Sequence, residues 1–225
     1  GVSALRGGAY KPTTFPIKKS VNGWKEGLQK KGLEYLSEAK SIVGLPIVSE
    51  IMDPRQLESS LEYIDIVQVG TRNFQNYSLL DELGKIDKPI LLKRGTWATL
   101  DEILGALERI LNGGNKKVMI CLRGVVGAPS YRHIFKSTRW SPDIMMIPAL
   151  KQFVDIPIIY DPSHACGNRD FVKTISKAAI SAGADGLIIE THENPTKSIS
   201  DPDQAIKPKE LASILQFYQK YSDIF

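Results

Sequence analysis

Residues 89–111, PILLKRGTWATLDEILGALERIL, contain the unit of structure that decides the fold. Its first part, residues 89–94, is a short apolar run that ends in two cations, which is typical of a buried strand with a charged carboxyl end. Residues 99–111 then place apolar side chains at helical spacing, and Thr99 with Glu102 has the spacing of a capping box. A strand followed by a helix is the unit from which parallel α/β folds are built.

The same alternation of strand and helix recurs along the chain. Continuous apolar runs predict strands at residues 3–6, 46–52, 64–70, 89–94, 117–123, 157–161 and 186–190. Helices are predicted at residues 24–43, 54–62, 76–84, 99–111, 143–154, 170–182 and 208–222. Strands that are apolar without alternation are buried on both faces, as in a parallel sheet. We therefore predict one α/β domain over residues 1–225, either a (β/α)8 TIM barrel or a doubly wound open sheet.

The composition excludes several classes of protein. The chain has 225 residues, 42% hydrophobic and 24% charged, which indicates a globular protein and not a disordered one. No apolar run approaches the roughly 18 residues of a membrane span, and no signal peptide is recognisable. Two cysteines are too few for a disulfide framework, which favours the cytoplasm. A net charge of +4 without a dense basic stripe argues against nucleic acid and suits an anionic small substrate.

Charged or metal-capable residues follow nearly every predicted strand. They are Arg6, Lys11, Glu50, Gln68, Arg72, Lys93, Arg94, Arg123, Asp161, His164, Glu190 and His192. In a β/α barrel the carboxyl ends of the strands meet at one mouth, where the active site lies, so these positions favour the barrel. Seven predicted strands are one fewer than a barrel needs, so either the first βα unit is absent from this chain or the fold is an open sheet.

Two groups of these residues indicate a chemistry. The cationic group suits a substrate with several negative charges, since guanidinium groups match phosphate and carboxylate oxygens. Its members are Arg6, Lys11, Arg72, Lys93 and Arg123. The second group, His164, Glu190 and Asp201, offers one imidazole and two carboxylates, which suits Mn, Fe or Zn. A metal beside a polyanion site indicates activation of a carbonyl next to a phosphate ester.

Each of these residues also has a purely structural interpretation. A single Arg or Lys after a strand is commonly a solvated loop residue, although five in the same register favour a binding site. Residues 161–164 are equally compatible with an Asp-Pro turn. Cys121, inside an apolar strand, is interpreted as a core residue, whereas Cys166 beside His164 is either a loop residue or a metal or redox residue.

Eight short segments carry a family resemblance. They are LRGGAYKP (5–12), QVGTRN (68–73), LLKRGT (91–96), LRG (122–124), DPSHA (161–165), GADG (183–186), IETH (189–192) and SD (200–201). In this order they resemble the 3-deoxy-D-arabino-heptulosonate 7-phosphate (DAHP) synthases and the related 3-deoxy-octulosonate 8-phosphate synthases. The resemblance covers nearly the whole chain and is strongest at residues 5–12 and 157–201.

The resemblance implies a metal-dependent transferase that condenses phosphoenolpyruvate with an aldose phosphate or a related aldehyde. Phosphoenolpyruvate would be held by Arg6, Lys11, Arg72, Lys93 and Arg123. The divalent metal (Mn, Fe, Co or Zn) would be bound by His164, Glu190 and Asp201. Lys11 would also donate a proton to the aldehyde oxygen, and Asp161 and His164 would act beside the metal and the acceptor. A cytoplasmic homodimer or homotetramer is implied as well.

The chain departs from the family pattern in three places. The Gly-Pro-Cys-Ser segment that supplies the family's metal-binding cysteine does not occur, which agrees with an absent first strand. The usual Lys-Pro-Arg-Thr reads Lys11-Pro12-Thr13-Thr14, and residues 122–129 are also unusual. These last two changes leave phosphoenolpyruvate recognition intact and alter the acceptor side. An alternative hypothesis is therefore a catalytically silent barrel that binds a metabolite or acts as a regulatory subunit.

Overall fold

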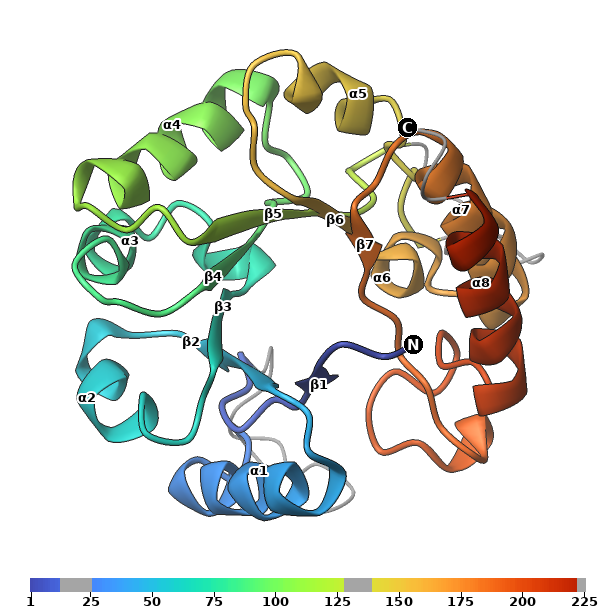
Figure 1. Ribbon diagram of the computed structural model, residues 1–225, viewed down its shortest axis with the longest axis horizontal. Coiled ribbons are helices and arrows are strands. Elements are labelled where there is room, and N and C mark those ends of the chain that lie inside the picture. The colour runs from blue at the N-terminus through green and yellow to red at the C-terminus, as the bar shows by residue number, and fades with distance from the viewer. Residues whose placement is uncertain (13–25, 128–138, 222–225) are drawn as a thin grey trace. The chain divides into compact units, whose positions relative to one another are not determined.

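The computed structural model describes residues 1–12, 26–127 and 139–221 (Figure 1). The chain forms two compact units, the first from residues 1–95 and 103–118 and the second from residues 96–102 and 119–225. Each unit contains parallel strands joined through helices. The predicted α/β class is therefore confirmed.

Parallel strands pair in chain order in the described part of the first unit. They are β1 (Leu5–Arg6), β2 (Ile47–Ile51), β3 (Ile66–Val69) and β4 (Ile90–Lys93). Arg6 pairs with Val48, and Glu50 pairs with Gln68, which in turn pairs with Leu91. The side chains of β2 to β4 are nearly all buried, as their continuous apolar runs predict.

Helices follow the strands of the first unit. They are α1 (Lys30–Val43), the short helices η1 (Pro54–Gln56) and η2 (Thr71–Asn73), α2 (Leu57–Ser60), α3 (Tyr77–Leu83) and most of α4 (Leu100–Asn112). Figure 1 shows α1, α2 and α3 on the same side of strands β2 to β4. Leu33, Leu79 and Leu80 are fully buried, so this side of the strands is covered by apolar helix faces.

The second unit has its own parallel strands, again paired in chain order. They are β5 (Val118–Leu122), β6 (Ile158–Tyr160) and β7 (Gly186–Leu187). Its helices are α5 (Met146–Lys151), α6 (Pro162–Cys166), α7 (Arg169–Ser181), η3 (Pro195–Lys197) and α8 (Pro208–Tyr221). Helices α7 and α8 pack side by side, next to β7 (Figure 1). No helix of the described residues is long and apolar enough to span a membrane.

Each predicted strand contains an observed one, but the strand predicted over 186–190 is shorter in the structure. Beyond Ile188 the backbone pairs with Ile206 instead, which donates to the Glu190 carbonyl at 3.0 Å. Residues 161–164, for which an Asp-Pro turn is one of two interpretations, form the start of helix α6. The Asp161 side chain accepts from the His164 backbone N–H and so caps that helix.

The helix predicted over 24–43 is wrong at its start and in its buried face. Residues 24 and 25 lie outside the described residues, and α1 begins at Lys30. Residues 26–29 instead bond to residues 9–11: Gln29 N–H donates to the Ala9 carbonyl at 2.8 Å, and Lys11 N–H to the Glu26 carbonyl at 2.9 Å.

Helical spacing also selects the wrong side chains of α1. Helical spacing along residues 24–43 predicts that Tyr35, Ile42 and Val43 share one apolar face, but they are 51%, 76% and 51% exposed. The buried residues of the helix are Gly32 and Leu33.

Helix α4 begins at the predicted capping box, which generates a stability prediction. Thr99 N–H donates to Glu102 Oε2 at 2.8 Å, and Glu102 N–H donates to Thr99 Oγ1 at 3.3 Å. Thr99→Ala removes one of these two bonds, and we expect the free energy of unfolding in urea to fall by about 1 kcal/mol. Thr99→Ser keeps the hydroxyl and is the control. An equal loss in both variants would contradict the capping role.

Candidate active site

Four polar side chains of the first unit lie toward the carboxyl ends of neighbouring strands. Arg6 ends β1, Glu50 and Gln68 are paired across β2 and β3, and Lys93 ends β4. Arg6 Nε donates to Gln68 Oε1 at 2.9 Å, and Gln68 Nε2 donates to Glu50 Oε2 at 3.2 Å. The strand ends are therefore linked by a chain of side-chain hydrogen bonds, as their common register requires.

Glu50 is the centre of this group. Its second oxygen, Oε1, is buried and has no hydrogen-bond partner among the described residues. A Cβ at position 70 would lie only 1.9 Å from this oxygen, so the close approach of the carboxyl to β3's end requires Gly70. An unpartnered buried acceptor is costly, which marks the position as one that a ligand or water completes.

Burial has the largest effect on the pKa of the Glu50 carboxyl. Burial raises the pKa of the Glu50 carboxyl above its ordinary value of 4.5, and this outweighs the opposing charges of Arg6, Lys93 and Arg72. Lys93 itself is only 3% exposed. Three cations around one carboxyl leave an excess of positive charge, which favours an anionic ligand.

The other two predicted cations of the first unit lie nearer solvent. Arg72 Nη1 donates to the Pro12 backbone carbonyl at 2.5 Å, which ties η2 to the segment that follows β1. Lys11, in that segment, is exposed. The structure thus brings Arg6, Arg72 and Lys93 together around Glu50, with Lys11 on the adjoining segment.

In the second unit, Asp161 and His164 form a close pair. Asp161 follows β6, is 1% exposed and accepts from the His164 backbone N–H at 2.8 Å. His164 Nδ1 lies 2.7 Å from Asp161 Oδ2, and Nε2 lies 4.0 Å from Glu190 Oε1. A carboxylate against Nδ1 fixes the imidazole so that Nε2 is presented to a further partner.

Arg123, directly after β5, joins this arrangement. It is buried, and its Nη2 donates to the His164 backbone carbonyl at 3.2 Å. Its guanidinium carbon lies 5.7 Å from the centre of the Trp140 ring. The cation is therefore held against the helix that carries the histidine.

Two of the three predicted metal ligands face each other. His164 Nε2 lies 4.0 Å from Glu190 Oε1, and an imidazole nitrogen and a carboxylate oxygen are both ligands that divalent metals accept. By their chemistry these two side chains would suit a metal. Within the described ranges no three His, Cys, Asp or Glu side chains form a metal-binding group. Asp201 instead has Oδ1 3.7 Å from Arg139 Nη1, so its role as third ligand stays a prediction.

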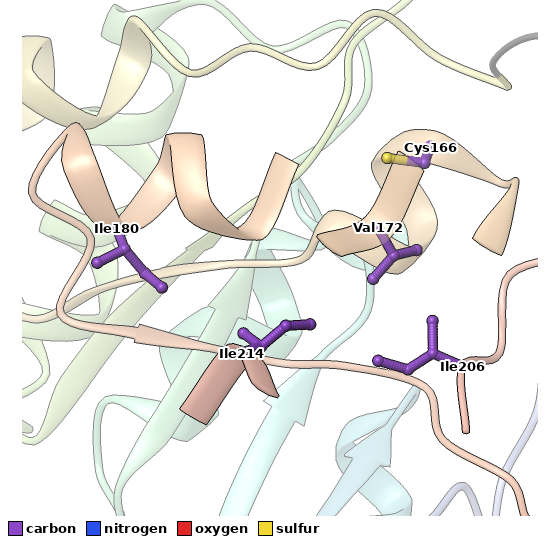
Figure 2. Packing of buried hydrophobic residues seen from close by; sticks show 5 residues of the cluster. All are labelled: Cys166, Val172, Ile180, Ile206 and Ile214. Carbon is purple, nitrogen blue, oxygen red and sulfur yellow. The ribbon is translucent and has the colours of Figure 1, made fainter. Parts of the chain in front are cut away.

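Neither cysteine is available for chemistry. Cys121 is buried in β5, as predicted. Cys166 packs in a buried aliphatic cluster (Figure 2) with Val172, Ile180, Ile206 and Ile214. Burial, with a smaller contribution from the Asp161 charge, raises the pKa of the Cys166 thiol to about 12. Because the thiolate is the reactive and metal-binding form, Cys166 is a structural residue.

Sequence reasoning missed four residues of this region. Glu50 and Gln68 are predicted at strand ends but without a role, although their position is the same signal that identified the cations. Trp140 lies next to the unusual segment, and no pattern in the sequence distinguishes Arg139. Only their contacts in the structure show that these four residues belong to the region of the candidate site.

Comparison with known proteins places the chain among enzymes with these motifs. The model of the DAHP synthetase I family matches residues 3–225. The chain belongs to this family. Phospho-2-dehydro-3-deoxyheptonate aldolase of Thermotoga maritima is 42% identical over 223 residues, which are 99% of this chain and 62% of that protein. The resemblance read from the motifs is thereby confirmed.

A further relative and two solved structures are also similar to this member of the DAHP synthetase I family. A 2-dehydro-3-deoxyphosphooctonate aldolase of Geobacter sulfurreducens is 25% identical over 210 residues, which cover 88% of this chain and 74% of that protein. A crystal structure of the Thermotoga maritima DAHP synthase superposes with a TM-score of 0.85 at 41% identity, covering 99% of this chain and 61% of that one. A truncated form of the Thermotoga maritima enzyme superposes with a TM-score of 0.82 at 39% identity. The match covers 99% of this chain and 77% of that one. The chain thus spans about three fifths of the full-length Thermotoga protein.

The raised pKa of Glu50 predicts a pH dependence of stability. A carboxyl whose pKa is higher in the folded than in the unfolded state binds more protons when folded, so it stabilises at low pH and loses that contribution as pH rises through the folded pKa. Relative to Glu50→Gln, we expect wild type to lose stability in urea titrations as the pH rises above the ordinary carboxyl value of 4.5. Glu58→Gln, at an exposed position of α2, is the control. A flat difference for Glu50 would contradict the raised pKa.

Proposed function

We propose that this protein catalyses the condensation of phosphoenolpyruvate with an aldose phosphate or a related aldehyde. The products are a 3-deoxy-2-keto sugar acid and inorganic phosphate. The observation that carries the proposal is the cationic group around Glu50, formed by Arg6, Arg72 and the buried Lys93. The Thermotoga relative, a DAHP synthase by name, supports the same reaction.

Phosphoenolpyruvate is a small ligand with a carboxylate and a phosphate, and each needs its own cations. Guanidinium groups bind either group through paired hydrogen bonds, and a buried lysine adds a point charge. We assign this binding to Arg6, Lys11, Arg72, Lys93 and Arg123. The low exposure of Lys93 and Arg123 excludes competing water and strengthens their attraction for an anion.

The acceptor side is assigned to the second unit. His164, Glu190 and Asp201 would hold the divalent metal (Mn, Fe, Co or Zn), which when bound polarises a carbonyl oxygen as a Lewis acid. Asp161 orients His164 through the 2.7 Å contact with Nδ1. The 4.0 Å spacing of His164 Nε2 and Glu190 Oε1 supports this assignment.

The reaction balances with water as the third reactant. C3 of phosphoenolpyruvate forms the new bond to the aldehyde carbon, and water adds to C2. Inorganic phosphate then leaves with the bridging oxygen as the bond between C2 and that oxygen breaks, and the hydroxyl that water supplied loses its proton to become the C2 ketone. Lys11, on the exposed segment after β1, donates a proton to the aldehyde oxygen as it becomes a hydroxyl.

The finer architecture belongs to the same proposal. We assign residues 1–225 to a single phosphoenolpyruvate-binding domain, and the seven strands of the described residues to a (β/α)8 TIM barrel. The parallel strands of both units and the TM-score of 0.85 support it. A cytoplasmic homodimer or homotetramer remains the assembly that we propose.

The reaction is tested by phosphate release. Protein supplied with Mn²⁺ and phosphoenolpyruvate is incubated with erythrose 4-phosphate and, separately, with a panel of other aldehydes. We expect phosphate release that depends on at least one aldehyde. If calorimetry shows phosphoenolpyruvate binding but no aldehyde produces phosphate, the silent metabolite-binding barrel is correct instead.

The phosphoenolpyruvate site is tested at Lys93. Loss of a buried charged donor costs about 1.5–3 kcal/mol, so Lys93→Ala should weaken phosphoenolpyruvate binding at least tenfold in isothermal titration calorimetry. Lys117→Ala is the matched control, because Lys117 is half-exposed and pairs with Asp87 at 2.7 Å. An unchanged dissociation constant for Lys93→Ala would show that this cationic group does not bind the substrate.

A further inference from the structure

Gln68, in β3, is a buried amide that lies between a cation and a carboxyl. Its side chain accepts from Arg6 Nε through Oε1 at 2.9 Å and donates to Glu50 Oε2 through Nε2 at 3.2 Å. The residue is only 1% exposed. A buried amide that lost either bond would leave a polar group unsatisfied, so the two bonds hold the three side chains in one arrangement.

The register of the strands places these three side chains on one face of the sheet. Gln68 is paired with Glu50, so their side chains point to the same side. Arg6 is paired with Val48, which precedes Glu50 by two residues, and side chains of a strand alternate between the two faces. Arg6 therefore points to that side as well. Strand β2 separates β1 from β3, and the long side chains of Arg6 and Gln68 meet over it.

The chemistry of the two partners decides which way the Gln68 amide is turned. A guanidinium only donates hydrogen bonds, so the amide oxygen faces Arg6. The amide nitrogen then faces the Glu50 carboxyl, whose oxygens accept. That carboxyl lies close against Gly70, where a Cβ would be 1.9 Å from Oε1. Glu50 therefore fixes the amide, and the amide fixes Nε of Arg6.

The bond at Nε fixes the plane of the Arg6 guanidinium. Arginine is a long side chain, and its planar group binds a carboxylate or a phosphate through paired N–H bonds whose direction follows that plane. A guanidinium that is already oriented loses less conformational freedom when an anion binds. The ammonium of Lys93, at the end of β4, is a point charge without such a plane. Orientation matters for Arg6 in a way that it does not for this lysine.

We propose that Gln68 is a positioning residue for phosphoenolpyruvate, which acts by holding the Arg6 guanidinium in the orientation that binds an anionic group of the substrate. The inference rests on the proposed function, which assigns Arg6 to phosphoenolpyruvate binding. In this role Gln68 contacts Arg6 and Glu50 and not the substrate. Its effect on substrate affinity therefore passes through Arg6.

The test is a double-mutant cycle on phosphoenolpyruvate affinity, measured by isothermal titration calorimetry. Gln68→Met keeps an unbranched side chain of similar length and removes both hydrogen bonds. We expect it to weaken phosphoenolpyruvate binding about fivefold to tenfold, and Arg6→Ala to weaken binding at least as much. In the Arg6→Ala background, Gln68→Met should change the dissociation constant less than twofold, because the side chain that it positions is gone.

Asn115 offers a matched control, as a buried amide of the same unit. Its Nδ2 donates to the carbonyls of Leu83 at 3.1 Å and Lys88 at 2.9 Å, and its Oδ1 accepts from Lys117 N–H at 2.9 Å. Asn115→Leu should lower the urea midpoint and leave the dissociation constant unchanged. An equal loss of affinity in this variant would show a general effect of losing a buried amide. If Gln68→Met does not fold by circular dichroism, Gln68→Asn replaces it, since the shorter amide cannot reach both partners.

The outcomes separate this inference from the proposed function. Wild type that does not bind phosphoenolpyruvate would overturn the proposed substrate site and the role of Gln68 with it. Wild type that binds while Gln68→Met binds equally well would overturn the positioning role alone. An equal loss from Gln68→Met with and without the Arg6 side chain would also overturn it, because Gln68 would then act independently of Arg6.

Discussion

Parallel pairing of neighbouring strands in chain order is the constraint on which the candidate site depends. In the first unit it places Arg6, Glu50, Gln68 and Lys93 toward the same ends of successive strands, where two hydrogen bonds connect three of them. In the second unit it places Arg123 and Asp161 directly after paired strands. Side chains distant in the sequence meet because each occupies the equivalent position of its own strand.

Burial strengthens the electrostatic interactions of the charged residues at these positions. Lys93, Arg123 and Asp161 are each less than a tenth exposed, so their charges act through little water. Burial also outweighs three nearby cations at Glu50 and keeps its pKa raised. Because three cations surround a single carboxyl, the excess of positive charge suits a small polyanion. The same physical effect disfavours the thiolate of Cys166, which is the reactive form of a cysteine.

Much of the fold was predictable because strands buried on both faces have continuous apolar runs, and each predicted run contains an observed strand. The failures have local causes. The capping of His164 N–H by Asp161 makes a helix from what reads as a turn. Exposed Ile42 and Val43 show that helical spacing identifies an apolar stripe but not whether a neighbour covers it. Strand β7 is shorter than predicted because Ile206, which is distant in the sequence, bonds to the backbone that follows it.

The sequence by itself determined the α/β class, the order of the strands and the charged residues at their ends, because these follow from local composition and period. It also carried the motifs by which the chain joins the DAHP synthetase I family. Only the tertiary structure decided the contacts of Glu50 with its cations, of His164 with Asp161, and of Asp201 with Arg139. Burial and distance are properties of the packed chain, and they decide which charges act on one another.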